Sequence, residues 1–299
     1  MKSINRIFLF GDSWIEGQGC YEKIENNNFH EPSFNNETHT NLLREWRRNI
    51  GWNVPLKELT SCKIINYGVQ GSDNYSQFSE LNNILPTLTD TDLVVIGFTS
   101  KLRDSNSLNY YWKLHNSNSV LSQDNPLRGH ISWEKKSVQV GNFGLTDESK
   151  TRINFSTKNE LEFTEKFIED YLISLYNDVA YEHIAQCNYY FLQERFKSLG
   201  LNLICFDLFE PYVDKKYVSE NLNIDKNVYI TFGEKSMNDF LIEYEIKHIK
   251  ENDTPIWENG DRRPDLKGFD ASHPNQNGYK LIIDYIFKDI LSKQYKFIK

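Results

Sequence analysis

Short runs of consecutive apolar residues recur along the chain, each bounded by Gly, Asn or Asp. They cover residues 7–10, 64–65, 93–98 and 201–206. An unbroken apolar run, unlike an alternating one, is typical of a strand that is buried on both faces of a parallel sheet. We therefore expect these four segments to be strands of one such sheet.

Segments with apolar residues at helical spacing lie between and after these runs. In the first two, the apolar positions are Leu42, Leu43, Trp46 and Ile50, followed by Tyr75, Phe78, Leu81 and Leu85. A third helical stretch covers about 160–199, and a last one covers roughly 276–291. The alternation of strand and helix favours a doubly wound α/β domain with helices on both faces of the sheet.

Two regions interrupt this rhythm. Residues 104–157 are rich in Asn and Ser, and residues 211–263 mix charges and Pro with one expected helix near 237–249. We interpret both as insertions on a single domain that spans 1–299. Because loops at strand ends often carry function, we expect the insertions there.

The composition is that of a globular protein, with 39% hydrophobic and 25% charged residues, and it excludes a disordered chain. The formal net charge of −8 repels phosphate backbones, so we expect no nucleic-acid partner. The four cysteines form no C-x-x-C pair and are expected to be buried or incidental thiols in a reducing compartment. They are Cys20, Cys62, Cys187 and Cys205.

We found neither a signal-like leader nor an uncharged apolar stretch of about 20 residues in the sequence. The expectation is a soluble protein with no membrane span, cytoplasmic by default. Placement in a virion or export without a leader stays open.

The sequence Gly11-Asp12-Ser13-Trp14 follows the first expected strand directly. Ligand sites of open α/β sheets lie where the carboxyl end of a parallel strand turns toward a helix, so Ser13 is a candidate nucleophile. The alternative interpretation is a helix N-cap, because Asp and Ser both accept hydrogen bonds from backbone N–H groups.

A second motif, Asp270-Ala271-Ser272-His273, precedes the last expected helix. A histidine three residues after an aspartate can present one ring nitrogen outward while the other donates to the carboxylate, which is the arrangement of an oriented general base. The alternative is a solvated loop histidine. Asp261, Asp265 and Asp270 with His273 show no metal-ligand spacing, and we expect no metal.

Together the two motifs resemble the first and last sequence blocks of the SGNH, or GDSL-like, hydrolase superfamily. The resemblance implies a three-layer α/β/α sandwich with a mainly parallel, flavodoxin-like, five-stranded sheet and insertions. It also implies that Ser13 is the nucleophile and that Asp270 and His273 complete a catalytic triad.

The resemblance extends to the blocks that build the oxyanion hole. Asn66-Tyr67-Gly68-Val69-Gln70-Gly71-Ser72 looks like the second block, with Gly71 as the backbone donor beside the Ser13 N–H. In the third block the family has Gly-x-Asn-Asp, whereas this chain has Gly97-Phe98-Thr99-Ser100. Thr99 is therefore expected as the third donor, with Asn74 and Arg103 as alternatives.

Four residues are candidate substrate contacts under this interpretation. They are Asp12, Asn74, Ser100 and Arg103. For one of them, Arg103, the alternative is an exposed loop arginine without such a contact.

The resemblance implies a serine esterase that needs no cofactor. The polar, Tyr-rich insertions favour acetyl esters on a carbohydrate, so the expected partner is a small-molecule or glycan ester, and the oligomeric state stays open. Two alternatives are an O-acyltransferase acting on a glycan and an SGNH-fold binding or structural module that has lost catalytic power with the block-three asparagine.

Overall fold

The computed structural model describes residues 1–20, 22–23, 29–30, 39–69, 72–99, 140–141, 144–145, 178–209, 211–213, 224–248, 256–257 and 273–297. Its central sheet has the strand order β5-β2-β6-β9, and every pairing in it is parallel. The strands are β2 (Arg6–Phe10), β5 (Lys63–Asn66), β6 (Asp92–Phe98) and β9 (Asn202–Asp207). Each lies on one of the four apolar runs, so the prediction of a parallel sheet is confirmed.

In the described residues this sheet has four strands, whereas five were expected. Numbered along the chain, its order is 2-1-3-4, that of the first four strands of a flavodoxin-like sheet. Beyond β9, the described residues contribute a single parallel bridge between Cys205 and Tyr229. The extended segment is short because a turn precedes it at Asp225, whose carbonyl accepts the Val228 N–H, and positive φ angles follow at Gly233 and Glu234.

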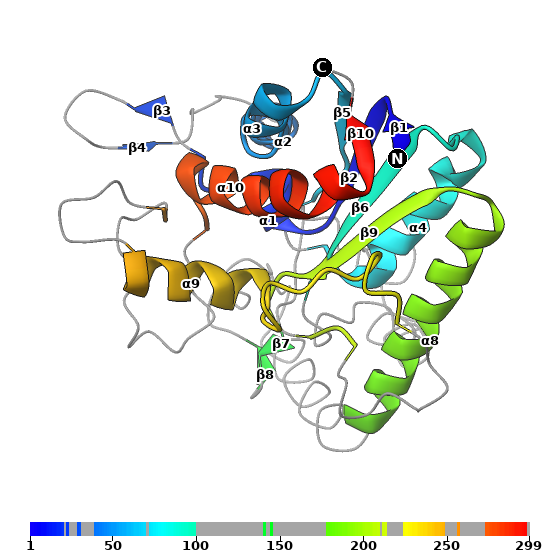
Figure 1. Ribbon diagram of the computed structural model, residues 1–299. Coiled ribbons are helices and arrows are strands. Elements are labelled where there is room, and N and C mark those ends of the chain that lie inside the picture. Colours follow the sequence, from blue (N-terminus) through cyan, green and yellow to red (C-terminus); the bar gives the residue numbers. More distant parts are fainter. Residues whose placement is uncertain are drawn as a thin grey trace.

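Helices cover both faces of the sheet (Figure 1). Because successive strand residues point to opposite faces, Ile7 and Leu9 pack on one side with α3, α9 and α10, and Phe8 and Phe10 pack on the other with α4 and α8. These helices are α3 (Asn53–Leu59), α4 (Asn74–Ile84), α8 (Asp178–Ser198), α9 (Met237–His248) and α10 (Gln276–Ile283). The α/β prediction with two helical layers is confirmed.

The helix predictions hold with small changes of boundary. Helix α2 (His39–Ile50) covers the first predicted helix, α4 the second, and α10 continues through a π-helical segment (Asp284–Ile290) into a short 3-10 turn (Leu291–Lys293). The first part of the long stretch near 160 lies outside the described residues. Tyr75 was expected on the buried stripe of α4, but its side chain is 61% exposed.

Smaller elements complete the description. Strand β1 (Lys2–Ile4) pairs in parallel with β10 (Tyr295–Phe297), which brings the two ends of the described chain together. The other short elements are the hairpins β3 (Glu22–Lys23) with β4 (Phe29–His30) and β7 (Val140–Gly141) with β8 (Gly144–Leu145), the helix α1 (Ser13–Glu16), and the 3-10 turn Leu85–Thr87.

Part of the predicted insertion 211–263 belongs to the main core. Ile230, Phe232, Met237 and Leu241 are buried among the residues that pack on the α10 side of the sheet. The predicted insertion 104–157 lies outside the described residues except for β7 and β8.

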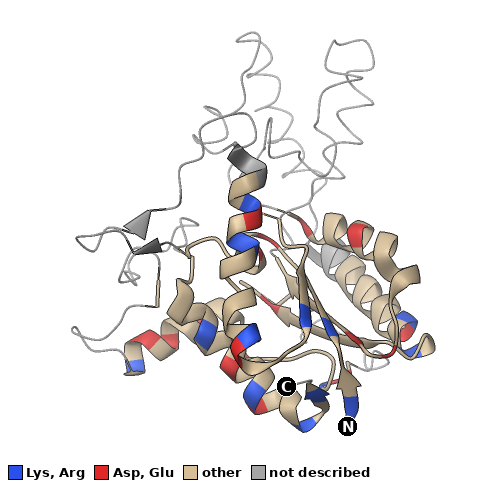
Figure 2. Cartoon of the chain, turned by 90° about the horizontal axis from the view of Figure 1, so that it is seen from above, with Lys and Arg blue, Asp and Glu red and all other residues tan. Residues whose placement is uncertain are grey.

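The surface and the cysteines fit a globular protein. Acidic and basic residues are interspersed along the described helices (Figure 2). Cys20, Cys62 and Cys205 are buried and Cys187 is exposed, as expected for buried or incidental thiols. Within the described residues, we find no helix that combines the length and the apolar character needed to cross a membrane.

Candidate active site

Ser13 is the first residue of α1 and stands just beyond the carboxyl end of β2. Asp12 is the N-cap of this helix, since its Oδ1 accepts the Trp14 N–H at 2.9 Å. The turn from strand to helix is tight: a Cβ on Gly11 would lie 2.1 Å from Ile15 Cγ1. The N-cap interpretation therefore applies to Asp12 and leaves the Ser13 hydroxyl available for another partner.

The Ser13 hydroxyl lies 3.0 Å from Nε2 of His273, although the two residues are 260 positions apart. Ser13 is only 5% exposed, and the histidine ring lies against the buried Trp14, with 6.4 Å between ring centroids. The predicted meeting of the two end motifs is present in the structure. A hydroxyl and an imidazole nitrogen at this distance can exchange a proton.

The backbone directly after His273 is held by a bridge, a hydrogen bond and a helix cap. Pro274 forms an antiparallel bridge with Trp257, and the Asn275 N–H donates to the Ile256 carbonyl at 2.9 Å. Asn275 then caps α10, its Oδ1 accepting the N–H groups of residues 277 and 278. His273 is thus held two residues before a capped helix. Asp270, the predicted third member of the triad, lies outside the described residues, and its role stays a prediction.

Aromatic rings pack around Trp14, which also contacts the His273 ring. Trp14 packs edge-on against Phe209 and Trp257, with ring centroids 4.9 and 6.1 Å apart. The Trp52 indole N–H donates to the Trp14 carbonyl at 2.9 Å. Apolar surroundings exclude water and strengthen the electrostatic interactions beside them.

Thr99 is not placed as an oxyanion donor, which corrects the expectation from its position in the sequence. Its side chain is fully buried, and its hydroxyl donates to Oδ2 of Asp12 at 2.9 Å. A threonine hydroxyl has one proton to donate, and here the Asp12 carboxylate takes it. Thr99 therefore supports the turn that carries Ser13.

Asp12 and Asn74 are likewise engaged in hydrogen bonds around the turn that carries Ser13. Asp12 is fully buried, and its two oxygens accept from Trp14 and Thr99. The Asn74 amide pairs with the backbone of Thr99 in both directions, accepting the N–H at 2.9 Å and donating to the carbonyl at 2.9 Å. Ser100 and Arg103 lie outside the described residues.

The second family-like block lies against α1. Val69 donates to the Gly11 carbonyl at 3.0 Å, and a Cβ on Gly68 would lie 2.4 Å from the Glu16 backbone nitrogen. Asn66 joins the two segments, because its Nδ2 donates to the Ile15 carbonyl while its Oδ1 accepts the Gly68 N–H. We did not single out Asn66 from the sequence, although Asn two residues before Gly is a known turn signature. Gly71 lies outside the described residues.

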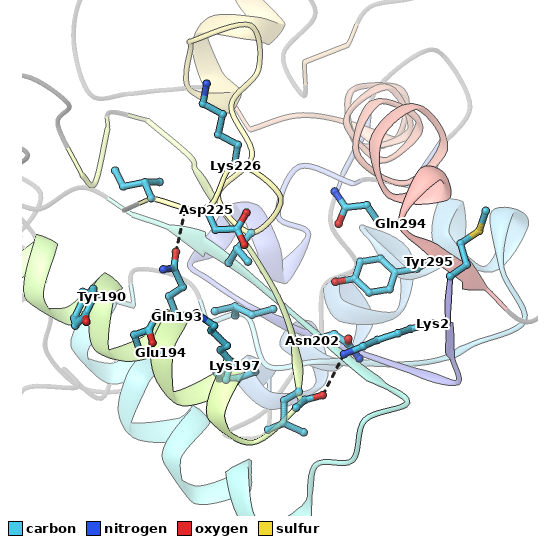
Figure 3. A pocket seen from close by; sticks show the side chains of 17 residues that line it. Lys2, Tyr190, Gln193, Glu194, Lys197, Asn202, Asp225, Lys226, Gln294 and Tyr295 are labelled. Carbon is cyan, nitrogen blue, oxygen red and sulfur yellow. Dashed lines mark hydrogen bonds and ion pairs between the residues drawn. The ribbon is translucent and has the colours of Figure 1, made fainter. Parts of the chain in front are cut away.

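A groove on the opposite rim of the sheet is separate from this site (Figure 3). It has a volume of about 1030 Å³, and Lys2, Asn202 and Tyr295 are among its lining residues. Asn202 begins β9, whereas Ser13 follows the carboxyl end of β2, a strand of the same parallel sheet. In a parallel sheet these two kinds of strand end lie on opposite rims, so the groove and the serine–histidine pair are distinct.

Comparisons with known proteins identify no family for this chain, so the site is interpreted from its geometry. A scan against protein-family models gives no match, and a search of curated proteins gives no relative. Within the described part of the chain, we find no group of three or more His, Cys, Asp or Glu side chains arranged to hold a metal ion.

Proposed function

We propose that this protein is a serine hydrolase of the SGNH type that cleaves carboxylic esters through an acyl-enzyme. The observation that carries the proposal is the 3.0 Å separation between Ser13 Oγ and His273 Nε2 at the carboxyl rim of the sheet. The strand order of the sheet, the capped turn that carries Ser13 and the bridge directly after His273 support it.

In the proposed reaction His273 removes the proton from Ser13 as Oγ attacks the ester carbonyl. The protonated imidazole then returns a proton to the leaving alcohol, which departs and leaves the acyl group on Ser13. Water attacks the acyl-enzyme, His273 takes its proton, and the acid is released with the serine restored. Asp270 is expected to orient the imidazole.

The oxyanion is assigned to backbone donors. The Ser13 N–H belongs to the first turn of α1, where amides have no acceptor within the helix, and Gly71 is the expected second donor. Thr99 is withdrawn as the third donor because its proton is directed to Asp12.

Acetyl esters on carbohydrates are the substrate class we propose. The polar, Asn- and Ser-rich composition of 104–157, which follows β6 in the chain, favours a hydrophilic alcohol over a long lipid. Transfer of the acyl group to a sugar hydroxyl uses the same acyl-enzyme. Product analysis with and without an acceptor glycan separates hydrolysis from transfer.

The test is hydrolysis of p-nitrophenyl acetate by the full chain and by Ser13→Ala and His273→Ala. We expect each variant to lose at least about 10³ in rate, because members of a triad act as a unit. Ser61→Ala and His183→Ala, both at exposed positions, are matched controls that should keep wild-type turnover. Undiminished turnover in the Ser13 and His273 variants would contradict the mechanism.

A second candidate is a binding module that keeps the fold without catalysis. The engaged Thr99 hydroxyl favours it, since removal of one oxyanion donor costs about 10² to 10³ in rate. A fluorophosphonate distinguishes the two. Covalent labelling of Ser13 in the wild type, absent in His273→Ala, supports the hydrolase, whereas an unlabelled wild type supports the binding module.

A further inference from the structure

Two adjacent arginines near the end of α2 contact the two segments that surround Ser13. Arg47 pairs with Glu16, the last residue of α1, at 3.5 Å between Nη1 and Oε1. Both side chains are buried, at 7% and 1% exposure. The helix that begins with Ser13 is therefore tied to α2 at its other end.

Arg48 holds the turn after β5. Its Nε and Nη2 both donate to the Gly68 carbonyl, at 2.9 and 2.7 Å. The N–H of the same peptide unit, on Val69, donates to the Gly11 carbonyl at 3.0 Å. One peptide group thus links the Arg48 guanidinium to the residue that stands two positions before Ser13.

The two hydrogen bonds of this peptide strengthen each other. The positively charged guanidinium that donates to the carbonyl oxygen polarises the peptide group. This polarisation makes the peptide N–H a better donor toward Gly11. Desolvation by burial lowers the pKa of Arg48, with the nearby Glu16 carboxylate acting in the opposite direction. A guanidinium withdrawn from water needs acceptors, and the Gly68 carbonyl supplies one.

The clamped peptide leads directly into the segment of the expected backbone donor. The Val69 carbonyl accepts the Ser72 N–H at 2.9 Å, so Val69 is also hydrogen-bonded to Ser72. An oxyanion hole works only when its donors are placed within fractions of an ångström of the developing charge. Here the Ser13 donor starts α1, so its position depends on what holds the turn at Gly11 against the segment that follows β5.

We propose that Arg48 is a positioning residue that fixes the Gly68–Val69 peptide against the Gly11 carbonyl and thereby sets the position of the Ser13 backbone donor at the start of α1. This inference rests on the proposed function. Arg48 touches no reacting atom and acts through the Gly68 peptide.

The kinetic test compares Arg48→Gln, Arg48→Lys and the exposed control Arg195→Gln with p-nitrophenyl acetate. A displaced donor weakens the transition state more than the ground state. We therefore expect Arg48→Gln to lower kcat by about 10- to 100-fold, below the loss of a whole donor, with KM changed by less than about twofold. Arg48→Lys keeps a positive charge that can donate from one ammonium group, and it should recover part of the rate.

Chemical rescue separates positioning from general destabilisation. Guanidinium at millimolar concentration should restore part of the kcat of Arg48→Ala and leave Ser13→Ala inactive. Amide hydrogen exchange of Val69 and Ser72 should be faster in Arg48→Gln than in Arg195→Gln at equal global stability.

The outcomes are distinguishable. If Ser13-dependent hydrolysis is absent from the wild type, the proposed function itself fails. If hydrolysis depends on Ser13 but Arg48→Gln keeps wild-type kcat, only the role of Arg48 fails. The role of Arg48 also fails if a lower melting temperature explains the whole loss of rate. In that case guanidinium gives no rescue, and amide hydrogen exchange at Val69 and Ser72 is unchanged.

Discussion

The Thr99 hydroxyl donates to Oδ2 of Asp12 at 2.9 Å, linking the end of β6 to the N-cap of α1. Both side chains are fully buried. The residue that stands where a hydrolase of the resembled family has an oxyanion donor thus supports the carboxylate that caps the serine helix.

The Thr99–Asp12 bond predicts a structural phenotype at position 99. Thr99→Val keeps the shape but removes the donor, and it should reduce the free energy of unfolding by about 1–3 kcal/mol because a buried carboxylate oxygen loses a partner. Turnover should fall by less than about tenfold, whereas loss of a direct oxyanion donor costs about 10² or more. Chemical denaturation and steady-state kinetics measure the two effects.

Thr99→Ser is the matched control, since it keeps the hydroxyl. It should stay closer to the wild type in both measurements. A Thr99→Val protein with wild-type stability and a rate reduced by 10² or more would return Thr99 to the oxyanion hole.

The buried Glu16–Arg47 pair predicts a large stability loss on removal of one partner. Arg47→Leu leaves the Glu16 carboxylate buried without this guanidinium and should cost about 3–5 kcal/mol of unfolding free energy. The double variant Glu16→Leu/Arg47→Leu should recover part of that loss, because it removes the buried carboxylate together with its guanidinium partner. Urea denaturation of the two proteins measures the difference.

The exposed pair between Lys280 and Glu58 serves as the control, with Nζ and Oε2 3.0 Å apart and both side chains more than half exposed. Lys280→Leu should leave the free energy of unfolding nearly unchanged, because water screens an exposed pair. A double variant at 16 and 47 that is as unstable as Arg47→Leu would mean that the ion pair is not the source of the effect.

The Arg6–Asp92 pair at the amino ends of β2 and β6 predicts a pH dependence of stability. Arg6 donates to both carboxylate oxygens, at 2.6 and 2.5 Å, and Thr89 donates to one of them. Burial acts to raise the pKa of Asp92, but these donors outweigh it and hold the pKa below its ordinary value of 3.8. The stabilisation is therefore complete above pH 3.8 and is lost as the pH falls through the lower pKa of the folded state.

Asp92→Asn should be less stable than the wild type at pH 7 by about 1.5 kcal/mol, at the low end of the range for hydrogen bonds to charged groups because Arg6 is partly exposed. The difference should shrink as the pH is lowered below 3.8. Melting temperatures measured across this pH range test both statements, and a difference independent of pH would contradict the assignment to Asp92.

The strands and the two end motifs were readable from the sequence for local reasons. A strand buried on both faces must be apolar throughout, so 93–98 could be recognised without knowledge of its neighbours. The edge of the sheet beside β9 could not be recognised in this way. A fifth strand is reduced there to a one-residue bridge at Tyr229, because turns on both sides limit the extended segment. The last helix was predicted from its apolar spacing, and the structure adds that Asn275 is its N-cap.

What the sequence determined by itself is the order of strands and helices and the candidacy of Ser13 and His273, since both depend on residue type and near neighbours. Only the tertiary structure decided which groups meet across distant parts of the chain. It brings the serine hydroxyl to the imidazole, turns the Thr99 proton toward Asp12 and places Arg48 on the Gly68 carbonyl. Such contacts depend on the packing of separate segments, and a hydroxyl with one proton can serve only one of the acceptors that the sequence leaves open to it.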